Sequence, residues 1–273
     1  MTASPTGLAS TEDMYTLPEQ PLGAEVFTAR YRMRTSDIDA AMRLRLDAVA
    51  RYLQDIAADM IETWQHYETD PFWILRRTII DVIEPISWPG NVTVQRWCSA
   101  TSTRWMNMRQ TIRSSHETSP FNPEHRPPGH IETESFCIKV DRSGQLSRIT
   151  EAAQEHLNRH VADTRLRWRP LITEPLPAAS ADDRQFSIRA TDIDPFDHVN
   201  NAVYWHAVEN ELAMHPDLIE RRHRAIVEFL RPIPPATRVT VRTSRDPHQL
   251  VVWLLLDENT IAATATVRLL DER

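Results

Sequence analysis

The chain has 273 residues and a formal net charge of −7, and it is long enough for two domains of ordinary size. An acidic chain lacks the basic surface that phosphate backbones require, so nucleic acid is excluded as the main partner. No apolar run approaches the roughly 18 residues of a membrane span. None of the five glycines belongs to a dinucleotide, P-loop or GxSxG motif, so nucleotide binding and a serine nucleophile are not expected.

The first 24 residues are rich in Pro, Ser, Thr and Glu and lack the cationic start and apolar core of a signal peptide. This composition predicts a flexible tail over residues 1–24. The two cysteines, Cys98 and Cys137, lie in apolar, strand-like stretches, as buried thiols do in a reducing compartment. We therefore expect a cytoplasmic protein.

A six-residue pattern, Arg-x-Ser/Thr-Asp-Ile-Asp, occurs twice, at Arg34–Asp39 and at Arg189–Asp194. Each copy is followed by a stretch with apolar residues at three- and four-residue spacing, Leu44–Ala58 and Val199–Ala213, which predicts an amphipathic helix. Further blocks match in the same order: Ile80–Ile86 with Val227–Ile233, Val92–Val94 with Val239–Val241, and Thr133–Asp141 with Ala263–Asp271. Ordered matches separated by loop-sized gaps indicate a duplicated unit.

Each unit is predicted to contain a strand, a long helix and then several antiparallel strands, which is an α+β arrangement. β-branched and aromatic runs predict strands at Val92–Trp97, Arg238–Thr243, Leu250–Leu256 and Ile261–Leu269. The prolines of Pro170–Asp183 discourage helix and predict a linker. The expected units are therefore residues 25–169 and 184–273, joined by residues 170–183.

The first unit is longer than the second, mainly in the polar, Pro-rich stretch Ser114–His130. Insertions belong in surface loops. The histidines of this stretch, His116, His125 and His130, match no zinc-ligand spacing. No metal and no cofactor are expected.

The second copy differs from the first in the residues after its signature, because only the second copy contains His198, Asn200 and Asn201. Pro195 and the polar residues that follow it predict a turn that leads into a helix N-terminus. Unpaired N–H groups at such an end can stabilise an oxyanion, and Asp194 beside the turn could act as base or nucleophile. A purely structural interpretation, in which Asp194 and Asn200 serve as turn and capping residues, is the alternative.

At these residues the chain resembles the hotdog thioesterases, and specifically the acyl-ACP thioesterases that have two hotdog domains in one chain. Asp192–Tyr204 is similar to their second-domain motif, Asp-x-Asp-x-Asn-x-His-Val-Asn-Asn-x-x-Tyr. The resemblance covers roughly residues 25–271. It implies a double hotdog, with two long helices each wrapped by an antiparallel sheet. It also implies that the acyl chain lies along the helix of the first domain.

The resemblance implies catalytic roles for Asp194, His198 and Asn200. Substrate contacts are expected at Asn201, Phe196, Tyr204 and Glu228. Two positions depart from the family pattern. Phe196 replaces the motif Asn, and Pro232-Ile233 replaces a downstream Glu-Cys pair, so no cysteine nucleophile is present there.

The implied function is hydrolysis of fatty acyl thioesters of acyl carrier protein, or of CoA, to free fatty acids in lipid metabolism and fatty acid biosynthesis. We expect Asp194 to activate water while backbone N–H groups near His198–Asn200 hold the carbonyl oxygen. The basic stretch Arg221-Arg222-His223-Arg224 is either an ordinary surface or a contact for the acidic carrier. Whether two chains form a homodimer is left open.

Two other functions are considered. Double-hotdog enoyl-thioester hydratases resemble Gly-Asp-x-Asn-Pro-x-His, but here the Gly and Asn are missing and the acid-to-histidine spacing is one residue shorter. A non-catalytic acyl-thioester binder is favoured only by Phe196, which removes a polar group from the motif.

Overall fold

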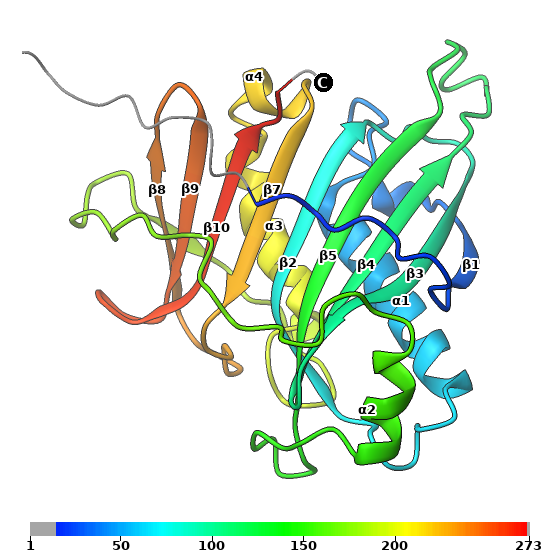
Figure 1. Ribbon diagram of the computed structural model, residues 1–273. Helices are drawn as coiled ribbons and strands as arrows, with labels where there is room; N and C mark the ends of the chain where they lie inside the picture. Colours follow the sequence, from blue (N-terminus) through cyan, green and yellow to red (C-terminus); the bar gives the residue numbers. More distant parts are fainter. Residues whose placement is uncertain (1–14, 272–273) are drawn as a thin grey trace, which may run out of the picture.

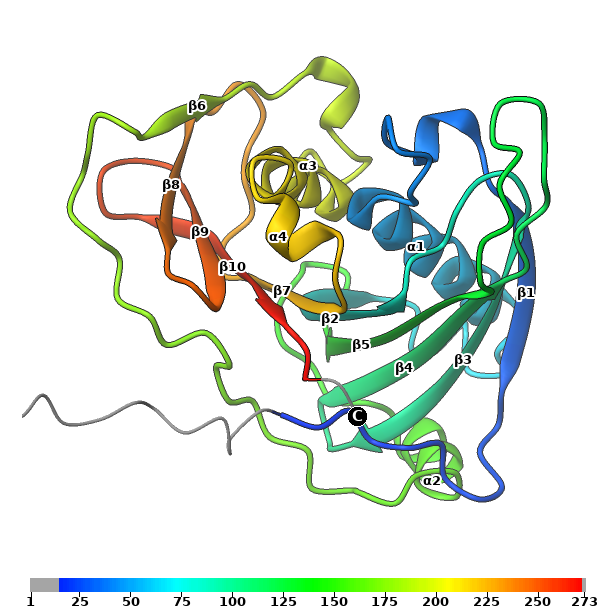
Figure 2. The same ribbon diagram turned by 90° about the horizontal axis from the view of Figure 1, so that it is seen from above.

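The computed structural model describes residues 15–271, which form one curved ten-stranded antiparallel sheet with its two main helices on the concave face (Figures 1 and 2). The predicted tail, residues 1–24, lies outside the described residues up to position 14. The remainder has no helix or strand, although the Tyr15 hydroxyl donates to the Glu134 carboxylate at 2.9 Å.

Both halves of the sheet have the same strand order. The first half contains β1 (Phe27–Arg32), β2 (Trp73–Glu84), β3 (Asn91–Thr101), β4 (Trp105–Ser114) and β5 (Gly129–Lys139), in the order β1-β3-β4-β5-β2. The second contains β6 (Arg184–Phe186), β7 (His223–Phe229), β8 (Val239–Arg245), β9 (Gln249–Leu255) and β10 (Ile261–Leu269), in the order β6-β8-β9-β10-β7. Strands β2 and β7 pair antiparallel where the halves meet. The internal repeat predicted from the sequence is confirmed by this topology.

The helices are less alike than the sequence predicted. Helix α1 (Leu46–Thr63) has 18 residues, but α3 (Asn201–Leu212) has 12. Pro216, which opens the short helix α4 (Pro216–Ile219), disfavours helical backbone at the residue before it, so α3 cannot run on. The prediction of two long helices, each with its own sheet, is therefore not confirmed, because one continuous sheet covers a long and a shorter helix.

The core lies between this sheet and the helix pair. Tyr52 of α1 and Trp205 of α3 are almost fully buried, as are apolar residues of both central strands. Burial of each such side chain contributes about 1.5–3 kcal/mol, and this packing holds α1 and α3 side by side. Cys98 and Cys137 are buried free thiols, as expected.

The four strands predicted from composition are confirmed as β3, β8, β9 and β10, although Arg238 and Leu256 lie just outside the observed strands, and the long insertion forms the β4–β5 connection. Helix α2 (Glu151–Asn158), which follows Thr150, was not predicted. The Pro-rich segment 170–183 contains no helix or strand, and Ile172 and Leu176 pack on the outer face of the second half-sheet. Within residues 15–271, no helix is long and apolar enough to span a bilayer.

Candidate active site

Both signature copies fold into the same loop before a helix. Each starts with a one-turn 3-10 helix, Thr35–Asp37 or Ala190–Asp192, in which the third residue accepts a bond from the backbone before it. The Asp39 N–H then donates to the Arg43 carbonyl at 2.9 Å, and the Asp194 N–H donates to the His198 carbonyl at 2.8 Å. The shared Asp-Ile-Asp sequence therefore specifies a backbone scaffold in both halves.

Only one carboxylate oxygen of Asp194 forms hydrogen bonds within this loop. Its Oδ1 accepts from the backbone N–H groups of Phe196 at 2.9 Å and His198 at 3.4 Å. Its Oδ2 has no hydrogen-bond partner among residues 15–271. In the first copy, by contrast, Asp39 Oδ2 is bonded to Arg43 Nε at 2.9 Å. Asp194 thus keeps a free oxygen that its counterpart lacks.

Asn200 caps α3 and ties it to α1. Its Oδ1 accepts from the Ala202 N–H at 2.9 Å, as an N-cap side chain does. The same oxygen accepts from Gln54 Nε2 of α1 at 3.1 Å. Gln54 was not predicted as a site residue. The repeat could have indicated it, because Gln54 occupies the position in α1 that Glu209 occupies in α3.

Most backbone N–H groups near His198–Asn200, where the oxyanion donors were expected, already have acceptors. The N–H groups of His198, Val199 and Asn200 are bonded to Asp194 Oδ1, the Ile233 carbonyl and the Asp192 carbonyl. These three groups are therefore not available to a substrate oxygen, because they form the hydrogen bonds of the loop itself. Within the described chain, the Asn201 N–H has no acceptor, and it lies at the positive end of the helix dipole.

The equivalent N–H in the first copy already binds an anionic oxygen. The Leu46 N–H, at the first position of α1, donates to a carboxylate oxygen of Glu209 from α3. Arg43 Nη2 holds the other Glu209 oxygen at 2.8 Å. The first copy is thus a closed version of the site, in which a side chain of the protein fills the position that is open at Asn201.

Three further predicted residues surround the second loop. His198 is partly buried, and its imidazole makes no hydrogen bond to any described residue. Phe196 is 74% exposed, so its ring covers nothing. Tyr204 is buried, and its hydroxyl donates to the Arg231 carbonyl at 3.4 Å. Burial raises the pKa of Tyr204 to about 12, and the nearby Asp194 carboxylate acts in the same direction.

Glu228 does not lie with the others. On β7, Val227 and Phe229 belong to the core beneath the helices, so the alternation of a strand directs Glu228 to the opposite face. There it accepts from the Leu171 N–H at 2.8 Å and lies 3.4 Å from an Arg77 nitrogen. The sequence could not reveal this side, because every residue of β7 is buried.

The basic stretch after α4 is not a uniform surface. Arg221 is exposed, but Arg224 is 3% exposed and its guanidinium forms a bidentate pair with Asp81 at 2.6 Å. Arg224 as a carrier contact is therefore wrong, because β7 directs its side chain against β2.

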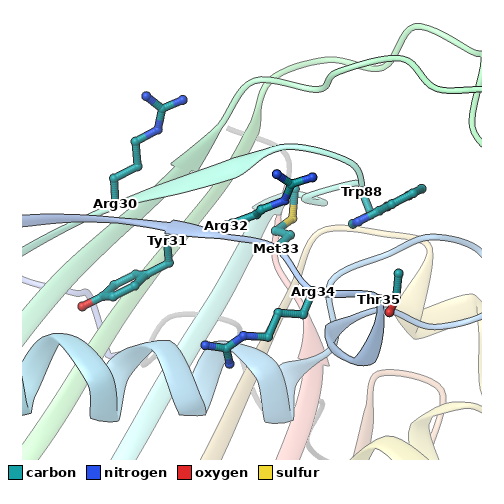
Figure 3. Close-up of a pocket in the computed structure, with 7 residues that line it drawn as sticks. All are labelled: Arg30, Tyr31, Arg32, Met33, Arg34, Thr35 and Trp88. Carbon is teal, nitrogen blue, oxygen red and sulfur yellow. The ribbon is translucent and has the colours of Figure 1, made fainter.

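A pocket of about 550 Å³ opens beside β1 rather than beside Asp194 (Figure 3). It is lined by Arg30, Tyr31, Arg32, Met33, Arg34, Thr35 and Trp88. Arg34 points toward α1 in Figure 3, whereas Arg30 points away from it. Since Arg34 and Thr35 open the first signature copy, this pocket belongs to the first loop.

The two loops contact the helices α1 and α3 at different positions along their axes. The start of α1 contacts Glu209, late in α3, while the start of α3 contacts Gln54, in the middle of α1. This antiparallel arrangement separates the two contacts by roughly 12 Å along α1, at about 1.5 Å per residue. None of the residues that line the arginine-lined pocket belongs to the loop before Asn201.

The chain is similar to proteins of one known family. Residues 24–119 match the acyl-ACP thioesterase N-terminal domain, and residues 177–263 match the acyl-ACP thioesterase C-terminal domain. An uncharacterized protein of Mycobacterium tuberculosis (strain ATCC 25618 / H37Rv) is 37% identical over 254 residues, covering 93% of this chain and 96% of that protein.

Two solved structures share the fold at low sequence identity. The 12:0-ACP thioesterase from Umbellularia californica has a TM-score of 0.65 at 16% identity, covering 89% of this chain and 96% of its own. An acyl-ACP thioesterase from Bacteroides thetaiotaomicron has a TM-score of 0.66 at 13% identity, covering 89% and 97%. With both family domains matched in order on a fold of this kind, the chain belongs to the acyl-ACP thioesterase family and is a thioester hydrolase.

Proposed function

We propose that the open second loop is the hydrolytic site, in which the Asn201 N–H holds the thioester carbonyl oxygen and Asp194 activates water. The observation that carries this proposal is internal to the molecule. At the equivalent point of the first copy, the Leu46 N–H binds an oxygen of Glu209. At Asn201 the same backbone geometry has no side chain of residues 15–271 in this position, so a substrate oxygen can take that place.

Three groups without hydrogen-bond partners among the described residues, namely Asp194 Oδ2, the Asn201 N–H and the His198 imidazole, provide the steps of the reaction. The free Oδ2 of Asp194 removes a proton from water, and the water oxygen attacks the carbonyl carbon. Negative charge then develops on the carbonyl oxygen, where the Asn201 N–H and the start of α3 stabilise it. Collapse of the tetrahedral intermediate breaks the carbon–sulfur bond and releases a carboxylic acid and a thiol. The unpartnered imidazole of His198 is the group we assign to protonate the departing sulfur.

The remaining residues position this machinery. Asn200, held by Gln54, fixes the first turn of α3 and thereby the direction of the Asn201 N–H. Tyr204 remains a neutral phenol beneath the loop, since its pKa is about 12. Phe196 is placed at the mouth of the site, where its exposed ring can meet the substrate. Glu228 is omitted, because it is held by Arg77 and Leu171 on the other face of the sheet.

We further infer that the two halves are two hotdog units, residues 25–169 and 184–273, joined by residues 170–183. The first unit is proposed to bind the acyl chain along α1. A second apolar cluster supports this assignment, because Met106 and Met108 of β4 pack with Leu157 of α2, and Met60 near the end of α1 packs against them. Methionines adapt their shape readily, as a surface for a flexible acyl chain requires.

The proposed substrate is a fatty acyl thioester of acyl carrier protein, with CoA thioesters as the alternative donor. Support comes from the match to the acyl-ACP thioesterase family, and a solved structure with the same fold is named a 12:0-ACP thioesterase. The compartment we propose is the cytoplasm, which fits two buried cysteines that form no disulfide.

Matched substitutions of the two signature aspartates test the proposal. Rates of thioester hydrolysis would be measured for acyl carrier protein and CoA thioesters of several chain lengths. Asp194→Asn is expected to lower kcat by at least about 100-fold, the scale of losing a general base. Asp39→Asn, the control in the same scaffold, should keep the wild-type rate within a few-fold. Equal rates for folded Asp194→Asn and wild type would exclude Asp194 as the base.

A further inference from the structure

Three potential metal ligands converge at a place unrelated to the hydrolytic loop. Glu25, just before β1, meets His156 and His160 at the C-terminal end of α2, and one ligand atom from each lies within 4.8 Å of the other two. Figure 2 shows the segment before β1 passing beside α2. We propose that these residues bind a divalent transition-metal ion of the zinc type.

The histidines are arranged as metal ligands usually are. His160 Nδ1 lies 3.1 Å from the Gly23 carbonyl, to which it donates, so Nε2 is left as the electron-pair donor. A backbone carbonyl that fixes the tautomer in this way is a common partner of a metal-bound histidine. His156 is one helical turn away, and its Nε2 lies 2.8 Å from Glu25 Oε2.

Gln65 supplies the same kind of support for His156. Its amide lies 2.8 Å from His156 Nδ1. When a metal occupies Nε2, the imidazole carries its proton on Nδ1, and the amide oxygen of Gln65 can accept it once the amide is turned over. Each histidine therefore has an outer partner that holds its ring.

There is space for one ion at this point. A cavity of about 20 Å³ is lined by all three candidate ligands, together with Met60, Trp64, Cys98 and Leu157. That volume holds about one water-sized particle. The ring of Trp64 lies against His156 at 6.4 Å between centroids and covers one side of the site. The apolar side chains of Met60 and Leu157 line the rest of the cavity.

The donor set selects the class of metal. Two neutral imidazoles and one carboxylate suit Zn²⁺ and similar ions, whereas Ca²⁺ and Mg²⁺ prefer an all-oxygen shell. The site lies near the end of α1, whereas the loop of Asp194 contacts α1 at Gln54. A bound ion would therefore fasten the segment before β1 to α2 at the edge of the apolar cluster with Met60 and Leu157, and would not contact the reacting carbonyl group.

Zinc binding to the full-length protein tests this proposal. After treatment with a chelator, Zn²⁺ would be titrated calorimetrically and thermal unfolding followed with and without the ion. We expect one Zn²⁺ per chain and a higher Tm in its presence. Co²⁺ in place of Zn²⁺ should give the visible absorption bands of low-coordinate cobalt. Hydrolysis should continue in the chelator-treated enzyme, which separates this proposal from that for Asp194.

Three variants locate the site. Glu25→Gln and His160→Ala should each weaken zinc affinity by at least roughly tenfold and abolish the rise in Tm. His125→Ala, which changes an exposed histidine of the β4–β5 connection, should bind zinc like wild type. Glu25 is exposed, so its variant retains the fold even if His160→Ala does not. Absence of zinc binding to the wild-type chain, or unchanged affinity in Glu25→Gln, would overturn the proposal and leave a metal-free hydrogen-bonded contact.

Discussion

The loop before α1 and the loop before α3 have the same backbone conformation but differ in the side chains that bond to their polar groups. Both have a residue with positive φ at the same place, Met42 at 63° and Asp197 at 60°. In the first loop Arg43 bridges Asp39 and Glu209, and Glu209 also takes the helix N–H. In the second loop His198 stands in place of Arg43, and Gln54 stands in place of Glu209. Neither side chain bonds to Asp194 Oδ2 or to the Asn201 N–H.

This difference shows how a duplicated scaffold can separate stability from chemistry. A charged, buried network occupies the first loop, and breaking such a network is costly because a charge is left without its partner. The second loop keeps the scaffold bonds but has unpaired groups at its centre, which is a destabilised arrangement typical of active sites.

The largest effect on kcat is expected from a substitution that places a carboxylate in the second loop, as Glu209 does in the first. Gln54→Glu places a carboxylate where Glu209 stands in the other copy, so it should compete with the substrate oxygen for the Asn201 N–H. We expect kcat to fall by at least about 100-fold, the scale of losing one oxyanion donor. Gln54→Ala, which removes the side chain without adding a charge, should lower kcat only a few-fold. Equal kcat values for these two variants would contradict the assignment of Asn201.

Removal of the carboxylate from the first loop should lower the free energy of unfolding and leave kcat almost unchanged. Glu209→Ala leaves the partly buried Arg43 unpaired and the Leu46 N–H without its acceptor, which should lower the free energy of unfolding by about 3 kcal/mol. Gln54→Ala is the matched control, and loss of its neutral hydrogen bond should cost about 1 kcal/mol. Urea unfolding measures both, and kcat of folded Glu209→Ala should stay within about threefold of wild type. A large loss of kcat would show that the first loop also supports the reaction.

The central strands of the two halves should differ in their response to acid. Burial lowers the pKa of His223 on β7 from 6.5 to about 4, whereas the matching residue of β2 is Arg76. The folded state therefore disfavours the charged imidazole. The stability present above pH 6.5 should decline as the pH falls toward 4, by up to about 3 kcal/mol. His223→Gln should remove this part of the pH dependence in urea unfolding, and an unchanged profile would place its origin elsewhere.

The smallest effect is expected at Phe196, where the family motif has Asn. Its ring is 74% exposed, so Phe196→Asn should change the free energy of unfolding by less than about 0.5 kcal/mol. An added amide beside Asp194 can orient the attacking water, and we expect kcat to rise a few-fold. Steady-state hydrolysis of one acyl thioester measures this, and a loss of activity would show that the contact of the ring with the substrate outweighs the effect of the added amide.

Much of the fold and part of the site could be predicted from the sequence. The Arg-x-Ser/Thr-Asp-Ile-Asp repeat predicted two units with the same element order, and β-branched runs located their strands. Asp194, His198, Asn200 and Asn201 were predicted as neighbours because they lie on one short loop, where local backbone chemistry fixes their spacing. The side that Glu228 faces could not be predicted, since β7 is buried on both faces and has no polar alternation.

What the sequence by itself determined is the duplicated scaffold and the local loop that presents Asp194, because both depend on residues close together in the chain. Only the tertiary structure decided which copy is open. The antiparallel packing of α1 against α3 brings Glu209 onto the start of one helix and Gln54 onto the start of the other. The same holds for Glu25 and for His156 and His160 at the C-terminal end of α2, which meet only because the segment before β1 passes beside that helix. Contacts between such distant residues depend on how the helices and strands pack, and no local pattern encodes them.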